Sequence, residues 1–593
     1  MAHPSLHTVL LVGSAVLASP SAADDRPAFE RPAQPLMCSQ LAGEAGELAG
    51  TPGIKAVTAV LAPPSGSNVS YCQVDILYGT SAEQNINVRV GLPLGPLDGG
   101  TGGVVGAWNG RTQGIGGGGC SGNLTVNAPV NLGYVGSGND TGHTGGNCEP
   151  AVNTDGSYNL QFINDFIRNG MKQQVLLSKR VATRYYAQGP AYNYWNGCST
   201  GGRQGYVLAQ ELPDELDGIL ANAPAIYWTR FQTAQMWGQI AMKDLTGGPI
   251  AAAKLARATA SAVAACDADD GVTDGVIDEP RSCTFSAKAN ICGAASAPAA
   301  DCLNAAEADA IDLIWDGPRN ADGKHIWFGL DRGTNIAALN GTPPFALGVT
   351  QFHWNTKNPT FDWSTVTLNS YADVAQQGSR NIADLTDTFG DLDEFRDNGG
   401  KLLTFVGAND QLIMPQGVLH YYRQMARRYR ESRHDDFGGV REFYRLFRGP
   451  GVAHCSGGAG PQPQRLFDAL VDWVENRVAP ETIPAMTSVD GTTRSRPLCL
   501  YPQTAIYKGS GSTDDAANFS CGGNLESRET VCDSVLVAYK QEVEGPLDYR
   551  EGAIARRECK DPRQGRGHGR GDGHHGDQDS GRDHDGTTTG QAP

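Results

Sequence analysis

The chain has 593 residues, of which 40% are hydrophobic and 19% charged, a composition typical of a globular protein large enough for more than one domain. Its formal net charge is −17, and it lacks the clusters of Lys and Arg that phosphate contacts require, which excludes a nucleic-acid-binding function. The 76 glycines indicate many loops and tight turns.

Residues 1–23 are typical of an export signal. An apolar run at 8–18 is followed by small residues up to Ala23, although the residues before the run include histidines and no Lys or Arg. We expect cleavage near Ala22 or Ala23, and hence a secreted or periplasmic protein. The run is too short to span a bilayer, and no later segment reaches about 18 consecutive apolar residues, so no membrane span is expected.

Strand patterns follow, with alternating apolar and polar residues, at 72–78, 86–90 and 104–110, and the last leads into a glycine-rich loop at 114–119. Helical and strand patterns then alternate: a helix at 160–173, a strand at 192–196, a helix at 202–212 and a strand at 217–221. This alternation indicates a parallel sheet.

Between about 228 and 395 the alternation stops, and tryptophans, Asp-rich loops and helical stretches such as 250–265 replace it. We interpret residues 228–395 as an inserted lid domain. The alternation resumes with a strand at 401–407, a helix at 418–431, a strand at 441–447 and a helix at 463–475.

The sequence therefore predicts one domain in two parts, 24–227 and 396–560, on either side of the lid. Residues 561–593 hold Gly, Asp, Arg, His and Thr with almost nothing apolar, and they predict a disordered polar tail.

Fourteen cysteines form an even set, which in an exported chain predicts disulfide bonds. None stands in a Cys-x-x-Cys pair, which argues against thiolate zinc sites and redox motifs. Proximity along the chain suggests six pairs: Cys38 with Cys72, Cys120 with Cys148, Cys266 with Cys283, Cys292 with Cys302, Cys499 with Cys521, and Cys532 with Cys559. The two that remain, Cys198 and Cys455, would pair with each other.

Ser199 stands in a Gly-x-Ser-x-Gly frame between a predicted strand and a predicted helix. This is the setting of a nucleophile elbow, in which small residues relieve the crowded turn. A serine becomes a nucleophile when an imidazole takes its proton and a carboxylate orients that imidazole. Asp410, after a late strand, and His454, on a loop before the last helix, stand in the order Ser, acid, His of an α/β-hydrolase. The predicted fold is therefore an α/β-hydrolase with a large inserted lid domain.

Ester hydrolysis also needs donors for the developing oxyanion. We expect the amide of Thr200 to be one donor, and an amide of the glycine loop to be the other. Gly118 is favoured, although the position on either side is equally defensible. His143, in a short polar turn, is expected to stabilise that turn rather than to act in catalysis.

Acidic residues gather in a glycine-containing loop between Cys266 and Cys283. Hard oxygen donors at short spacing suit Ca²⁺, although the spacing is not that of an EF-hand. The expected ligands are the carboxylates of Asp267, Asp270 and Asp274 and the carbonyls of Val272 and Val276. A solvated acidic loop is the alternative. Because this loop is in the lid sequence rather than beside the serine, we expect loss of the cation to affect stability more than chemistry.

The motif at 197–205, the Asp410 and His454 pair and the loop 267–276 together resemble the tannase and feruloyl esterase family. The resemblance covers about residues 38–522. It implies an α/β-hydrolase domain with a lid that holds structural Ca²⁺ at the five positions named above.

The resemblance also implies a role for each residue of the site. Ser199 would be the nucleophile, Asp410 the acid and His454 the base. A disulfide would join Cys198 and Cys455, the cysteines beside the serine and the histidine. The cysteine pair at 532 and 559 and the polar tail lie outside the resemblance.

Members of that family hydrolyse feruloyl and other hydroxycinnamoyl esters, galloyl esters and mono(hydroxyethyl) terephthalate. The expected partner is thus a small aromatic ester, free or attached to plant polysaccharide or tannin. Eight aromatic residues of the lid sequence could offer stacking surfaces: Tyr227, Trp228, Trp237, Trp315, Trp327, Phe352, Trp354 and Trp363. A terephthalate-ester hydrolase, a non-catalytic calcium-stabilised binding protein and a serine peptidase remain as alternatives.

Overall fold

The computed structural model describes residues 34–43, 48, 50–294, 300–321, 323–387, 390–430, 437–489 and 491–525. The expected export signal, the Cys532 and Cys559 pair and the polar tail lie outside the described residues.

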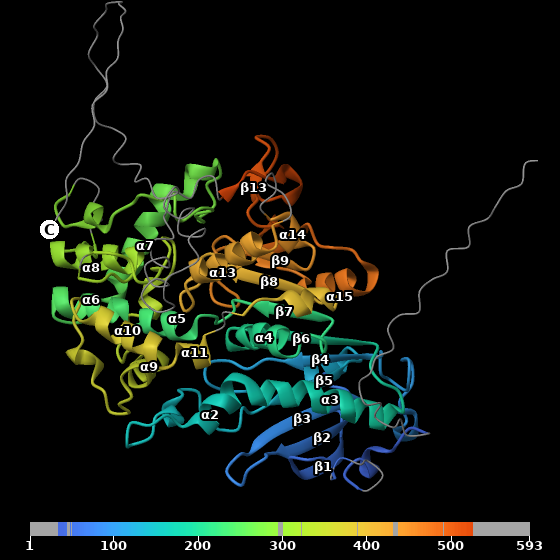
Figure 1. Cartoon of the computed structure of the whole chain (residues 1–593). Coiled ribbons are helices and arrows are strands. Elements are labelled where there is room, and N and C mark those ends of the chain that lie inside the picture. The colour runs from blue at the N-terminus through green and yellow to red at the C-terminus, as the bar shows by residue number, and fades with distance from the viewer. Residues whose placement is uncertain are drawn as a thin grey trace, which may run out of the picture. The chain divides into compact units, whose positions relative to one another are not determined.

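Nine strands form one mixed sheet in the order β1-β2-β3-β5-β4-β6-β7-β8-β9 (Figure 1). They are β1 (Ile54–Ala62), β2 (Tyr71–Tyr78), β3 (Ile86–Pro93), β4 (Arg111–Ile115), β5 (Val135–Asn139), β6 (Tyr192–Cys198), β7 (Gly218–Asn222), β8 (Lys401–Gly407) and β9 (Tyr444–Gly449). The pairs from β1 through β3 to β5 are antiparallel, and those from β5 through β4 to β9 are parallel. This sheet confirms the predicted α/β-hydrolase class.

Helices cover the parallel part of the sheet, which explains its apolar strands. Six of the seven residues of β8 and all six of β9 are buried, as expected for strands covered on both faces. The helices of this part are α1 (Asn127–Asn131), α2 (Leu160–Asn164), α3 (Gly170–Tyr186), α4 (Thr200–Glu211), α13 (Pro415–Arg428), α14 (Gly438–Arg441) and α15 (Leu466–Asn476). Helix α4 begins directly after β6, with Ser199 between the two, and packs against β6 and β7.

Two predicted elements differ from the structure. The strand expected at 104–110 is wrong: this segment forms turns, with Gly106 at φ 66° and Val104 63% exposed, and the strand begins at Arg111. A Cβ at Gly106 would lie 2.4 Å from the carbonyl oxygen of Leu94, so close backbone packing replaces the strand. The helix expected at 160–173 is interrupted by a π-helical turn, Asp165–Asn169, before α3 begins.

The segment between β7 and β8, which the sequence suggested as a lid, contains helices and no strand among its described residues. The helices are α5 (Trp228–Ala234), α6 (Trp237–Thr246), α7 (Ala252–Cys266), α8 (Ala305–Asp316), α9 (Ala346–Thr356), α10 (Tyr371–Asn381), α11 (Ala383–Thr386) and α12 (Asp393–Asp397). Figure 1 shows α5 to α10 gathered into one group. Met236, Trp237, Ile240, Phe352 and Tyr371 form part of the apolar core of this group, called the insertion below.

Two small sheets follow β9: β10 (Gln462–Pro463), β11 (Thr482–Val489) and β12 (Thr492–Cys499), then β13 (Thr504–Tyr507) and β14 (Phe519–Gly522).

Six disulfide bonds confirm six of the seven expected pairs. Five of them join cysteines within 34 residues of each other, whereas Cys198–Cys455 spans 257 residues. No helix in the described part of the chain combines the length and the apolarity that a membrane crossing requires.

Candidate active site

Ser199 occupies the turn between β6 and α4 in a backbone conformation that a non-glycine residue rarely adopts, with φ 63° and ψ −125°. Its amide donates to the carbonyl of Asn222 at 3.0 Å, and its carbonyl accepts from the amide of Ala225 at 3.0 Å. A Cβ at Gly197 would lie 2.4 Å from the backbone of Gly201, which shows why the frame needs glycine. Such strain persists where the surroundings enforce it and is common at functional sites.

Asp410 and His454 form a hydrogen-bonded pair. Asp410 Oδ2 lies 2.8 Å from His454 Nδ1, and the Asp410 side chain is fully buried. The other carboxylate oxygen accepts from the amides of Leu412 and Ile413, each at 2.8 Å. A carboxylate held in this way keeps a proton on Nδ1 and leaves Nε2 free to accept one.

A disulfide brings this pair to the serine. Cys198 and Cys455 are bonded, with their Cα atoms 5.9 Å apart, and they are the chain neighbours of Ser199 and His454. Among the described residues, neither Ser199 Oγ nor His454 Nε2 has a hydrogen-bond partner, whereas His454 Nδ1 is bound to the acid. Ser199 Oγ and His454 Nε2 are therefore both free of hydrogen bonds within the described structure. A hydrogen bond between a candidate nucleophile and its base often forms fully only when substrate binds.

Residues on either side of Asp410 form hydrogen bonds with the backbone of the loop that carries His454. The amide of His454 donates to Gln411 Oε1 at 3.1 Å, and the amide of Asn409 donates to the carbonyl of Val452 at 3.0 Å. Cys455 itself has φ 61°, a left-handed conformation. The loops that carry Asp410 and His454 are thus joined by hydrogen bonds on both sides of Asp410. The sequence did not indicate the contribution of Gln411.

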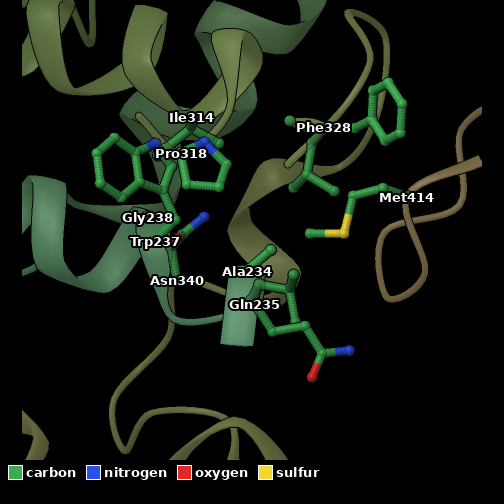
Figure 2. A pocket seen from close by; sticks show the side chains of 12 residues that line it. Ala234, Gln235, Trp237, Gly238, Ile314, Pro318, Phe328, Asn340 and Met414 are labelled. Carbon is green, nitrogen blue, oxygen red and sulfur yellow. The ribbon is translucent and has the colours of Figure 1, made fainter. Parts of the chain in front are cut away.

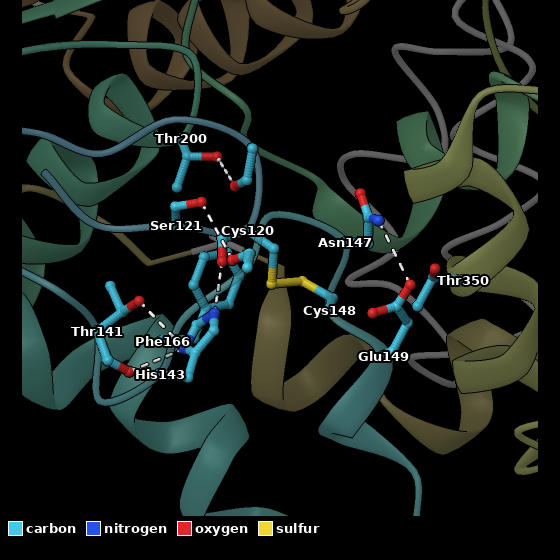
Figure 3. The surroundings of a disulfide bond; sticks show 12 residues. Cys120, Ser121, Thr141, His143, Asn147, Cys148, Glu149, Phe166, Thr200 and Thr350 are labelled. Atoms are coloured by element: carbon cyan, nitrogen blue, oxygen red, sulfur yellow. Dashed lines mark hydrogen bonds between the residues drawn. A yellow bond between two sulfur atoms is a disulfide. The ribbon is translucent and has the colours of Figure 1, made fainter. Parts of the chain in front are cut away.

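The glycine loop lies on the N-terminus of α4. Gly117 accepts from the amide of Gly201 at 2.9 Å and donates to Gln204 Oε1 at 2.9 Å. Thr200 Oγ1 donates to the carbonyl of Gly119 at 2.5 Å (Figure 3). These bonds fix the loop beside the residue that follows Ser199.

Two backbone amides of this region remain for an oxyanion. Thr200 is the first residue of α4, so its amide has no acceptor within the helix. The amide of Gly118 donates to the carbonyl of Ser121 at 3.1 Å, whereas the amide of Gly119 has no acceptor among the described residues. Of the two neighbouring positions, Gly119 is therefore the one whose amide is not already engaged.

His143 has a structural role, as expected. Its Nε2 lies 2.5 Å from the carbonyl of Cys120 and its Nδ1 lies 3.1 Å from the carbonyl of Thr141. Figure 3 shows the ring beside the Cys120–Cys148 disulfide, which closes the other side of the glycine loop. Both ring nitrogens of His143 are thus engaged by backbone carbonyls.

Arg203 is a buried cation that the sequence did not single out. Its guanidinium is fully buried, 4.9 Å from the ring centre of Phe166 and 5.5 Å from that of Trp228, and has no carboxylate partner among the described residues. Burial, with a smaller contribution from Arg168, lowers its pKa to about 9.

The aromatic residues of the insertion lie mostly in its interior. Seven of the eight that the sequence suggested for stacking are at most 5% exposed, and Trp363 is partly buried. Trp237 lines a small pocket together with Phe328 and Met414 (Figure 2). Gln235, also at the pocket, donates to the carbonyl of Leu412 at 2.7 Å, so the insertion contacts the acid loop.

In the acidic loop, all three carboxylates expected to bind calcium also bind protein groups, and Asp270 Oδ1 accepts from the amide of Val272 at 2.9 Å. The Asp267 carboxylate accepts from the amides of Asp274, Gly275 and Val276 at 2.9–3.2 Å. Asp274 Oδ2 lies 2.7 Å from Arg496 Nη2. Among the described residues, no three acidic, histidine or cysteine side chains lie together as a metal site would place them, so carbonyls such as that of Val276 would have to complete a ligand set.

Asp270 and Asp278 interact in the same loop, and Asp278 was not among the expected ligands. Burial and the neighbouring Asp270 raise the pKa of Asp278 to about 7, and burial, with Asp274, raises the pKa of Asp270. Crowded, buried carboxyls of this kind are stabilised as carboxylates by a bound cation. The donor chemistry therefore fits Ca²⁺.

The chain is similar in sequence and in fold to several known proteins. The family described as "Tannase and feruloyl esterase" matches residues 104–522. A "Probable feruloyl esterase" of Arthroderma benhamiae is 35% identical over 500 residues, which cover 78% of this chain and 89% of that protein. An esterase of Xanthomonas campestris is 33% identical over 392 residues, 58% of this chain and 67% of the other. The crystal structure of feruloyl esterase B from Aspergillus oryzae matches 82% of this chain and 99% of its own, with a TM-score of 0.69 and 24% identity.

Proposed function

Because the chain belongs to the tannase and feruloyl esterase family of ester hydrolases, we propose that it is a secreted serine carboxylesterase that cleaves esters of aromatic acids. The observation that carries the serine mechanism is the position of Ser199 at a strained elbow whose neighbour is disulfide-bonded to the neighbour of His454. The 2.8 Å bond from His454 to buried Asp410 supports their proposed roles as base and acid beside this nucleophile.

In the proposed reaction, His454 Nε2 takes the proton of Ser199 Oγ as this oxygen bonds to the ester carbonyl carbon. The amides of Thr200 and Gly119 donate to the resulting oxyanion, and each such donor contributes about 3 kcal/mol of transition-state stabilisation. His454 returns the proton to the leaving alcohol, which leaves an acyl-enzyme on Ser199. Water, deprotonated by the same nitrogen, then hydrolyses the acyl group and releases the acid.

The acid is proposed to be a hydroxycinnamic or a gallic acid. The 35% identical relative bears the name of a feruloyl esterase, which favours the first. We expect feruloyl and caffeoyl methyl esters to be hydrolysed with a kcat/KM at least about tenfold above that for mono(hydroxyethyl) terephthalate. A panel of feruloyl, caffeoyl, galloyl and terephthaloyl esters followed by chromatography checks this. Preference for the terephthaloyl ester would contradict it, and turnover of casein instead would indicate a peptidase.

Structural Ca²⁺ is proposed for the acidic loop. Asp270 and Asp278, with carbonyls such as that of Val276, would hold it, and the ion would neutralise carboxyls that burial otherwise penalises. Removal of the ion with a chelator is expected to lower the Tm by a few degrees, since a ligand that binds only the folded state stabilises it.

Differential scanning calorimetry with chelator, then with Ca²⁺ or Mg²⁺ restored, measures this effect. An Asp270→Asn variant is the matched control, because its Tm should no longer respond to Ca²⁺. An equal Tm with and without chelator in the parent protein would contradict the site.

Secretion is supported by the disulfides. Six bonds in the described residues, one of them spanning 257 residues, are typical of an oxidising compartment.

A further inference from the structure

We propose that Arg448 is a positioning residue: it joins the acidic loop of the insertion to β9, the strand that leads to the loop of His454, so that the insertion holds His454 in place. The inference rests on the proposed serine mechanism and adds a structural requirement to it. The sequence placed the acidic loop apart from the serine, but the structure brings it against the turn that precedes His454.

Arg448 is the penultimate residue of β9 and lies six positions before His454. Its side chain is 5% exposed, its Nη2 donates to the carbonyl of Asp278, and its Nη1 lies 3.4 Å from Glu279 Oε2. Asp278 and Glu279 belong to the end of the acidic loop. A buried guanidinium therefore connects the end of β9, the edge strand of the sheet, to the insertion, 170 positions away in sequence.

Direct packing supports the same connection. Gly451, three residues before His454, has φ 68°, and a Cβ built there would lie 2.8 Å from Val276 Cγ2. Val276 is 3% exposed and belongs to the acidic loop. At this point the acidic loop and the turn before His454 are in direct contact, so movement of one displaces the other.

Other segments of the insertion form hydrogen bonds with residues near Asp410. Arg281 donates to Gln416 Oε1 at 3.1 Å, and Gln416, in the first turn of α13, donates to Asp331 at 3.1 Å. Asn409, adjacent to Asp410, donates to the carbonyl of Arg332 at 3.3 Å. The insertion thus contacts the flanks of both Asp410 and His454.

The chemistry of the contact makes Arg448 the residue to test. The guanidinium is the cation beside Glu279 and near Asp278 and Asp331, whose carboxylates together raise its pKa although burial acts to lower it. Loss of this cation would remove the ion-pair partner of the buried Glu279 and leave Asp278 and Asp331 with only Arg496 and Arg281 nearby, so the loop would have to move to solvate Glu279. A shift of about 1 Å in the base is enough to slow a triad reaction up to about 100-fold.

The experiment compares Arg448→Met with Arg448→Lys and with a control, Arg445→Met. Arg445 is a buried arginine of the same strand, but it binds Glu481 and the carbonyl of Pro480 rather than the insertion. We expect Arg448→Met to lower kcat about tenfold with KM within about twofold, and to slow labelling of Ser199 by a fluorophosphonate to a similar extent. Arg448→Lys should recover part of the rate, and Arg445→Met should lower the Tm without this loss of kcat.

A Tm that falls in Arg448→Met while kcat and labelling stay at parent values would overturn the inference, because the arginine would then be structural only. If Arg448→Met does not fold, Glu279→Gln replaces it, since this change removes one partner and keeps the shape. Unchanged kcat in a folded Glu279→Gln would equally count against it. Failure of the proposed function looks different, since the parent protein itself would then neither hydrolyse esters nor take the label.

Discussion

Replacement of Ser199 by Ala is expected to lower kcat for feruloyl and galloyl esters by about 10⁵- to 10⁶-fold, with little change in the Tm. The expected loss is large because the acyl-enzyme cannot form without Ser199 Oγ. The proposed oxyanion donors, the amides of Thr200 and Gly119, could then assist only a direct attack of water on the ester. The Tm should be retained because Ala keeps the Cβ that the elbow accommodates and removes an oxygen without a hydrogen-bond partner in the described structure.

Two measurements check this result. Product release from ethyl ferulate and methyl gallate gives the rate, and intact-protein mass after treatment with a fluorophosphonate gives the label on Ser199. Ser178→Ala is a suitable control, because Ser178 is a buried serine that binds a helix carbonyl in α3. Parent-level hydrolysis by Ser199→Ala would refute the serine mechanism. A parent protein that takes no label and hydrolyses no ester would instead be a binding protein on the same fold.

Opening the Cys198–Cys455 bond is expected to lower kcat by about 100-fold or more before the protein unfolds. The bond joins the neighbours of the nucleophile and of the base, and Ser199 and His454 share no hydrogen bond of their own in the described structure. Without it, the left-handed turn at Cys455 loses its tether and the base can move away from the serine.

The bond can be opened by a thiol reductant or by the double variant Cys198→Ser with Cys455→Ser. The matched control is Cys499→Ser with Cys521→Ser, which removes the bond between β12 and β14. Activity and circular dichroism are followed together, and thiol labelling reports which bond is open. Full activity with the 198–455 bond shown to be open would refute the mechanical role assigned to it.

Most of the candidate site could be proposed from the sequence because its signals are local. The elbow is a short motif with glycines at fixed positions, and Asp410 and His454 follow elements in a known order. Five of the six disulfides could be paired by proximity, and the sixth, Cys198–Cys455, followed by elimination. Each of these inferences needs only neighbouring residues or chain order.

What could not be predicted depends on contacts between distant segments. Gly118 and Gly119 are indistinguishable in sequence, and only the bond from Gly118 to Ser121 separates them. The strand expected at 104–110 failed because a carbonyl of Leu94 takes the space near Gly106. Arg448 carries no signal at all, since its partners lie 170 positions earlier in the chain.

The disulfide between Cys198 and Cys455 also makes a covalent ring, which contains β7, the whole insertion, β8 and β9. A protease that cuts one peptide bond inside this ring cannot separate the products. Ser199 would then be on one fragment and His454 on the other, still joined through sulfur, and the nick would be visible on a gel only after reduction. The insertion can therefore be cut while the disulfide still joins the segments of Ser199 and His454. Because this link does not pass through the insertion, the insertion could also be lengthened or exchanged without breaking it.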